Sequence, residues 1–126
     1  EYAALNRRDL DDPARTQALF TLNLTHGNLR DTAGAAVYTF SKMSDPAVFR
    51  LALPEQEPEA AEMPVSIESS GKTVFRVDTA RVFRNPFGSE LRFLAPKEVL
   101  RPGQYQISIN TADGRYSRVY FQFRIE

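Results

Sequence analysis

The chain has 126 residues, its 16 Lys and Arg balance 16 Asp and Glu, and it contains no cysteine. This length predicts one domain whose core needs no covalent cross-link. The balanced charge argues against nucleic acid and anionic membranes as partners, because no net field attracts them. The lack of cysteine excludes disulfides, thiolate catalysis and cysteine-ligated metals.

The first residues differ in composition from the rest. Residues 1–16 are polar and include Pro13, so we predict a linker there and one β-domain over residues 17–126. The abrupt start at Glu1 is typical of a segment cut from a longer protein, and we expect a membrane anchor or targeting signal to lie outside it. No run approaches the roughly 18 apolar residues of a spanning helix, so we expect no membrane insertion by this segment itself.

Beyond the linker, apolar residues alternate with polar ones. Phe20, Leu22 and Leu24 predict a strand with one buried face, ended by a turn that begins at His26. Asn23 lies on the outward face of this strand, in a chance-level match to the glycosylation pattern. Val37, Tyr38 and Phe40 predict a second, short strand.

A clearer strand is predicted from Val48 to Leu53, directly after Asp45 and Pro46. Phe49, Leu51 and Leu53 face inward in this prediction, and Arg50 faces outward. Pro54 ends the strand, because proline cannot donate to a ladder of hydrogen bonds. The residues that follow, 55–62 (EQEPEAAE), are acidic and lack an aromatic anchor, so we predict a solvated and mobile loop.

A hairpin is predicted next, with one strand at Val65 and Ile67 and the other from Thr73 to Asp78, joined by a turn at residues 69–72 (SSGK). Its second strand offers three core candidates: Val74, Phe75 and Val77. Residues 81–88 (RVFRNPFG) are predicted to be a loop that carries Phe83 and Phe87. Leu91 and Phe93 then predict a strand that ends at Pro96.

The segment from Leu100 to Ile125 is the most informative in the chain. Two alternating runs, around Ile107 and around Phe121, are joined by a turn that contains Gly114, which predicts a β-hairpin. Tyr105 follows Pro-Gly at the position where sandwich domains place a tyrosine corner. Together with the spacing of the other strands, this predicts an all-β fold, an immunoglobulin-like antiparallel β-sandwich of seven to eight strands.

The predicted core consists of the apolar members of these alternating runs. They are Phe20, Leu22, Leu24, Phe49, Leu51, Ile67, Leu91, Phe93, Ile107, Ile109, Val119, Phe121 and Phe123.

No pattern in the sequence indicates catalysis, a cofactor or a metal. His26 is the only histidine, and it lies in a turn with no nucleophile motif beside it. Asp9, Asp11 and Asp12 lack the glycine and the distal glutamate of a calcium loop. The glutamates of residues 55–62 lie on a loop that cannot hold two carboxylates at a hydrolytic separation. We therefore predict a protein that is not an enzyme.

The candidate binding residues are Arg118, Tyr120 and Arg124, which are predicted to share the outward face of the last strand. Arginine and tyrosine are enriched in binding hot spots, so this face is predicted to contact an as yet unidentified protein partner. The alternative ligand is a glycan, which would need a strip of exposed aromatic rings. The candidates for such a strip are Tyr38, Phe83, Phe87, Tyr116 and Tyr120.

Apolar and turn residues in a characteristic order run from Phe20 to the C-terminus: Phe20-x-Leu22-x-Leu24, Val48-x-x-Leu51-x-Leu53-Pro54, Val65-x-Ile67, Leu91-x-Phe93, Leu100-x-Pro102-Gly103-x-Tyr105-x-Ile107 and Val119-x-Phe121-x-Phe123-Arg124-Ile125. This order resembles a β-sandwich module of bacterial membrane-anchored proteins, including those whose cytoplasmic end is an anti-sigma zinc-finger domain. The resemblance implies a location on the periplasmic or extracellular face of the cytoplasmic membrane, with residues 1–16 as the end of a juxtamembrane linker.

The sequence thus predicts a non-catalytic extracytoplasmic module that senses, binds or acts as a spacer in a larger bacterial membrane protein. Two alternatives stay open: a glycan-binding module, and an accessory domain of a secreted enzyme.

Overall fold

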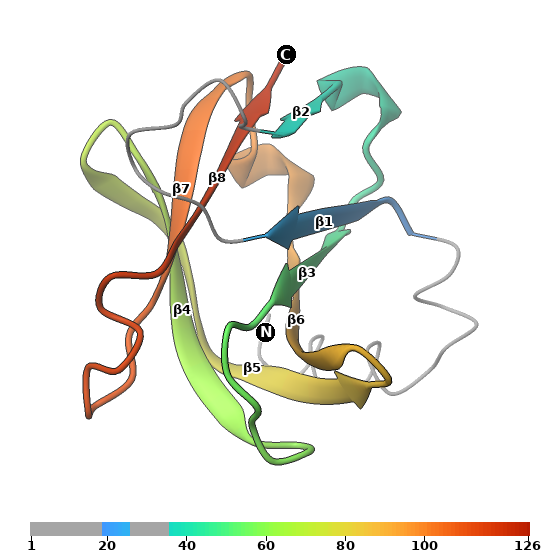
Figure 1. The fold of residues 1–126 in the computed structure, drawn as a ribbon. Coiled ribbons are helices and arrows are strands. Elements are labelled where there is room, and N and C mark those ends of the chain that lie inside the picture. The colour runs from blue at the N-terminus through green and yellow to red at the C-terminus, as the bar shows by residue number, and fades with distance from the viewer. Residues whose placement is uncertain (1–18, 26–35) are drawn as a thin grey trace.

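Eight strands form one continuous sheet that curls into a nearly closed barrel (Figure 1). The computed structural model describes residues 19–25 and 36–126, so the predicted linker and the turn at His26 lie outside the described residues. In chain order the elements are β1 (Thr21–Thr25), β2 (Ala36–Tyr38), the 3-10 helix η2 (Phe40–Lys42), β3 (Ala47–Ala52), β4 (Glu62–Ser69), β5 (Lys72–Asn85), β6 (Gly88–Ala95), the 3-10 helix η3 (Lys97–Val99), β7 (Gly103–Ile109) and β8 (Tyr120–Ile125). In the sheet the strands follow the order β1-β3-β6-β5-β4-β7-β8-β2.

The two outermost strands, β1 and β2, approach each other and bring the sheet close to closure. The Tyr38 hydroxyl donates to the Asn23 carbonyl oxygen at 3.2 Å, and the Phe20 and Tyr38 rings meet edge to face with centroids 5.9 Å apart. β1 is parallel to β3 and β2 is parallel to β8, whereas the other neighbours are antiparallel. The all-β prediction is confirmed, but the pairing forms one mixed sheet and does not establish an immunoglobulin-like sandwich.

β5 belongs to both halves of the sheet, because its first half pairs with β4 and its second half with β6. Figure 1 shows β4 and β5 bending together between these halves. Met63 of β4 pairs with Ala80 of β5, and Val65 pairs with Val77. The chain advances by two residues on β4 and by three on β5 between these pairs, so β5 holds one extra residue, as in a β-bulge. The buried side chains of β5 therefore lie at an odd-numbered position before the extra residue, Val77, and at even-numbered positions after it, Ala80 and Val82.

The prediction that residues 81–88 form a loop is wrong. β5 continues to Asn85 and forms a tight hairpin with β6, which begins at Gly88. At the tip of this hairpin, Phe87 is 99% exposed. Phe83 lies under the Arg92 guanidinium, 4.2 Å from the ring centroid.

Most of the predicted core is buried, and the buried members are Leu22, Leu24, Phe49, Leu51, Ile67, Leu91, Phe93, Ile107, Ile109, Phe121 and Phe123. Phe20 and Val119 are only partly buried, but they pack against this core. Phe49 stacks on Phe93 with ring centroids 4.9 Å apart. Val74 is exposed, so the prediction that it belongs to the core is wrong.

Two further strand predictions, and the position of one turn, agree with the structure within a residue or two. The predicted strand from Val48 to Leu53 is β3, and the short strand at residues 37–40 is β2, although Phe40 itself begins η2. β4 and β5 are joined by Ser70 and Gly71, whose φ angles are 53° and 78°. Positive φ at both central residues is typical of a type I′ turn, whose twist matches that of the flanking strands.

The tyrosine corner predicted at Tyr105 is present. Its hydroxyl donates to the carbonyl oxygen of Arg101, four residues earlier, at 2.5 Å. Its ring stacks on Phe123 with centroids 5.1 Å apart, and burial raises the pKa of Tyr105. The predicted hairpin of β7 and β8 is also confirmed, with Tyr105 directly opposite Phe123.

Candidate functional site

The outward face of β7 and β8 carries polar side chains in register. Because Tyr105, Ile107, Phe121 and Phe123 point inward, the residues between them point outward. Pairing across the two strands places three outward pairs side by side: Gln104 with Arg124, Gln106 with Gln122, and Ser108 with Tyr120.

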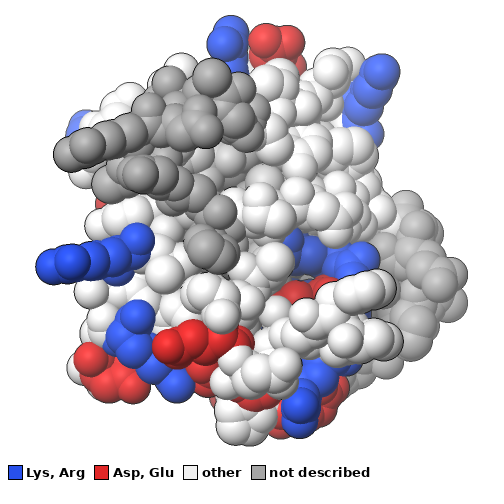
Figure 2. All heavy atoms as spheres, viewed as in Figure 1, with Lys and Arg blue, Asp and Glu red and all other residues white. Residues whose placement is uncertain are grey.

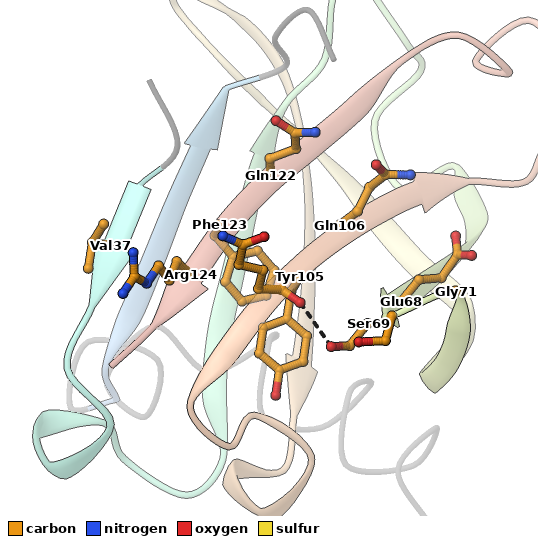
Figure 3. A pocket seen from close by; sticks show the side chains of 11 residues that line it. Val37, Glu68, Ser69, Gly71, Tyr105, Gln106, Gln122, Phe123 and Arg124 are labelled. Atoms are coloured by element: carbon orange, nitrogen blue, oxygen red, sulfur yellow. Dashed lines mark hydrogen bonds between the residues drawn. The ribbon is translucent and has the colours of Figure 1, made fainter. Parts of the chain in front are cut away.

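A hollow of about 560 Å³ lies over the first two of these pairs (Figure 3). Gln104, Gln106, Gln122 and Arg124 line it, and Figure 3 shows Gln106 and Gln122 on neighbouring strands in its floor. Val37 of β2 stands beside Arg124 at one side, and residues 68–71 of the β4–β5 turn form the opposite side.

A second hollow, of about 430 Å³, continues along β7 toward its C-terminal end. It shares Glu68 and Gln106 with the first hollow and adds Ser108, Tyr116 and Tyr120. We call the two hollows together the outer trough, which is defined by Glu68, Gln104, Gln106, Ser108, Tyr120, Gln122 and Arg124.

The outward side chains of the outer trough are mostly polar, its lining as a whole is mixed polar and apolar, and it has almost no net charge. Its carboxylate, on Glu68, accepts a hydrogen bond from Ser108 at 2.6 Å, and its guanidinium, on Arg124, lies 3.4 Å from the Glu126 carboxylate. Among the described residues, no side-chain hydrogen bond is made by the amides of the three trough glutamines, Gln104, Gln106 and Gln122. Figure 2 shows acidic and basic side chains intermingled on the face viewed there, without an extended patch of one sign.

The structure brings together two of the three predicted binding residues. Tyr120 is half-buried and Arg124 is exposed, and both line the outer trough. Arg118 is exposed in the turn before β8 and lines neither hollow. β8 pairs with β2 as well as with β7 at residues 123–125, so this part of the strand is not an edge. The role of the three residues in binding stays a prediction.

The sequence reasoning missed the trough glutamines, although their signal was present. Gln104 and Gln106 alternate with core residues on one strand of the hairpin, and Gln122 does so on the other. In a predicted hairpin, such outward positions form one face.

The prediction that residues 55–62 are solvated is wrong for Glu57, which is buried. Its carboxylate accepts hydrogen bonds from Arg115 at 2.8 Å and from the Tyr116 hydroxyl at 2.6 Å. Its backbone N–H donates to Ser89 on β6 at 2.9 Å. Burial, and then the hydrogen bond to the Glu57 carboxylate, raise the pKa of Tyr116. Glu57 therefore fastens this loop to the turn between β7 and β8.

A second buried carboxylate, that of Glu90 on β6, is surrounded by cations. Arg50 binds both of its oxygens at 2.7 and 2.8 Å, and Arg92 binds one at 2.6 Å. Asn85 donates to it at 2.7 Å. Burial opposes ionisation, but the hydrogen bonds and charges of the two arginines outweigh it and lower the pKa of Glu90 to about 2. A carboxylate held in this way is a structural counter-ion and a poor proton donor or acceptor near neutral pH.

The aromatic strip that a glycan site was predicted to need is not assembled. Tyr116 is buried, Phe83 lies under Arg92, and Tyr38 packs against β1. Phe87 is exposed at the far hairpin tip and lines a different hollow, of about 210 Å³. Of these five rings, only Tyr120 lies at the outer trough without being buried.

In the described ranges 19–25 and 36–126, no three His, Cys, Asp or Glu side chains are grouped as they would be to hold a metal ion. Over the same ranges, no helix has the length and apolar character needed to cross a membrane. His26 and the aspartates at positions 9, 11 and 12 lie outside them. Comparison with known proteins identifies no matching family model and no curated relative.

Proposed function

We propose that the chain is a non-catalytic recognition module whose binding surface is the outer trough. The observation that carries this proposal is that two neighbouring hollows share Glu68 and Gln106 in their lining and lie over paired strands whose outward side chains are mostly polar. Paired strands hold side chains more rigidly than loops, and the trough glutamines have amide groups that no described side chain satisfies. Such groups favour a ligand that supplies hydrogen-bonding partners.

The state of the buried carboxylates supports the non-catalytic part of the proposal. Glu57 and Glu90 are each held by arginine and lie on different parts of the molecule. A general acid or base needs a proton affinity near the working pH and access to substrate, and these residues are fastened for stability instead.

We further propose that the protein works as part of a larger bacterial membrane-anchored protein, on the outer side of the cytoplasmic membrane. The support is the sequence resemblance, in which residues 1–16 form a linker. In this setting the outer trough would sense or bind a ligand in the periplasm or at the extracellular face of the membrane.

The immunoglobulin-like character of the fold is also a proposal. Three features support it: a tyrosine corner at the start of β7, a terminal strand β2 parallel to β8, and a bend in β5 that divides the sheet into two halves. In this interpretation, β1, β3, β6 and the end of β5 form one layer, and the start of β5, β4, β7, β8 and β2 form the other.

The binding proposal is tested by paired substitutions. Tyr120→Ala and Arg124→Ala together should weaken capture of the ligand from a cell-envelope fraction of a bacterial host, because both residues line the outer trough. Phe87→Ala is the matched control, since it removes an exposed ring from a different surface. Arg118→Ala, outside both hollows, should have a smaller effect than Arg124→Ala.

The thermal midpoint of each variant shows whether the fold is intact, because exposed substitutions usually change stability by no more than about 0.5 kcal/mol. If the double variant captures the same material as the wild-type protein, the outer trough is not the binding surface. The role of a spacer would then be preferred.

A further inference from the structure

The trough glutamines provide an unusual concentration of neutral hydrogen-bonding groups. Each amide offers one acceptor oxygen and two donor hydrogens, and Gln106 lies directly opposite Gln122. The three trough glutamines line the hollow of about 560 Å³ together with the serine-containing β4–β5 turn. A ligand that fits this surface must combine donors and acceptors along its length.

The charge of the outer trough favours an uncharged ligand. Its one carboxylate, on Glu68, and its one guanidinium, on Arg124, lie on different strands and already have partners in Ser108 and Glu126. Charged ligands are steered by a field of the opposite sign, and the outer trough presents none.

Strand addition by a peptide is disfavoured by the strand pairing. β7 is hydrogen-bonded to β4 on one side and to β8 on the other, so the middle of the trough offers no free edge. Where β4 departs from β7, the Ser69 hydroxyl donates to the carbonyl oxygen of Gln104 at 2.9 Å.

Among the described residues, the outer trough presents no exposed apolar side chain at its centre to which a globular protein partner would bind. Protein interfaces derive much of their affinity from buried aromatic and aliphatic anchors at their centre. Tyr105 and Phe123 also line the first hollow, but both are buried. Its exposed large apolar side chain is Val37, which stands at its side.

Building on the proposed function, we propose that the outer trough binds a neutral, linear oligosaccharide along β7. Sugar hydroxyls both donate and accept hydrogen bonds, which matches the amides of Gln106 and Gln122. This site differs from the expected strip of exposed rings, because the amides carry the recognition and half-buried Tyr120 adds a single aromatic surface, against which the apolar face of a sugar ring packs. From Gln104 to Asn110 the trough spans about 20 Å, at roughly 3.3 Å per strand residue, so several sugar units bind at once.

The test uses the whole 126-residue chain, isotopically labelled for NMR. It is titrated separately with ladders of β-1,4-linked N-acetylglucosamine, β-1,4-linked glucose and α-1,4-linked glucose, each from disaccharide to hexasaccharide. At least one ladder should shift the side-chain amide signals of Gln106 and Gln122, with an affinity that rises with chain length and then levels off. A ladder of anionic oligogalacturonate should bind more weakly than the best neutral ladder.

Substitutions then locate the site. Gln106→Ala and Gln122→Ala together should weaken binding about 25-fold, from roughly fivefold for each lost hydrogen bond. Gln56→Ala is the matched control, because Gln56 is an exposed glutamine that lines neither hollow and bonds to Arg84. Its affinity for the same sugar should equal that of the wild-type protein.

The outcomes separate this inference from the function on which it rests. If no neutral ladder shifts the trough signals, or if shifts occur only around Phe87, the oligosaccharide inference is wrong. If the ladders give no shift but capture of envelope protein still depends on Tyr120 and Arg124, the ligand is a protein and the proposed binding surface stands. If neither sugar nor envelope protein depends on the outer trough, both proposals fall.

Discussion

Replacing Glu90 with glutamine should destabilise the protein strongly at neutral pH and hardly at all in acid. Glu90→Gln keeps the shape of the side chain but removes the charge that Arg50 and Arg92 bind. The pKa of Glu90 is about 2, against an ordinary value of 4.5. At about 1.4 kcal/mol per pKa unit, this difference corresponds to about 3 kcal/mol of stability.

Solvent reduces this figure, because the Arg50 side chain is 41% exposed and water screens its charge. We therefore expect Glu90→Gln to lower the free energy of unfolding by about 2 kcal/mol at neutral pH. Because the pKa is lower in the folded state, the contribution of Glu90 is complete above pH 4.5 and is lost as the pH falls toward 2. The difference between variant and wild type should shrink over that same range.

Urea titrations followed by circular dichroism at a series of pH values measure this difference. Glu55→Gln is the matched control, because Glu55 is an exposed glutamate on the loop and its replacement should change stability by no more than about 0.5 kcal/mol. A loss for Glu90→Gln no larger than that of the control at neutral pH would refute the reasoning. So would a loss that stays constant down to pH 2.

Two further predictions concern single hydrogen-bonding groups. Tyr105→Phe should lower the free energy of unfolding by about 1 kcal/mol in a denaturant titration, because the bond to Arg101 is lost; an unchanged stability would contradict the tyrosine corner. Glu57→Gln should cost about 1–3 kcal/mol, because the buried carboxylate that accepts from Arg115 and Tyr116 loses its charge, and it should speed amide hydrogen exchange in the turn between β7 and β8. Unchanged exchange there would show that Glu57 does not fasten the turn.

Much of the fold could be predicted because the alternation of apolar and polar residues indicates both that a segment is a strand and which of its side chains face the core. Phe121 and Phe123 were assigned to the core from spacing alone, and both are buried. The same reasoning failed in β5, where the extra residue between Val77 and Ala80 reverses the alternation. Beyond that point the pattern no longer continues the earlier one, and residues 81–88, predicted to be a loop, complete β5 and turn into β6.

The candidate site was predictable only in part, for a related reason. Tyr120 and Arg124 could be placed on one face because they lie on the same strand at even spacing. The contacts of Glu57 could not be predicted, since its partners Arg115 and Tyr116 are 58 and 59 residues away and nothing local marks them. Hollows depend likewise on how separate strands lie in space.

The extra residue in β5 has a consequence for which changes of chain length this fold tolerates. Deleting Thr79, which lies within the bulge, would restore simple alternation and leave Ala80 and Val82 facing the core, whereas deleting Arg81, beyond the bulge, would turn the following side chains over, since a shift of one residue exchanges the two faces of a strand. After that second deletion, Phe83 would point toward the core in place of Val82. The turn at Ser70 and Gly71 lies outside the paired residues, so a change of length there does not alter which side chains of β5 face the core. Related chains should therefore vary in length at this turn and keep the length of β5 beyond the bulge unchanged.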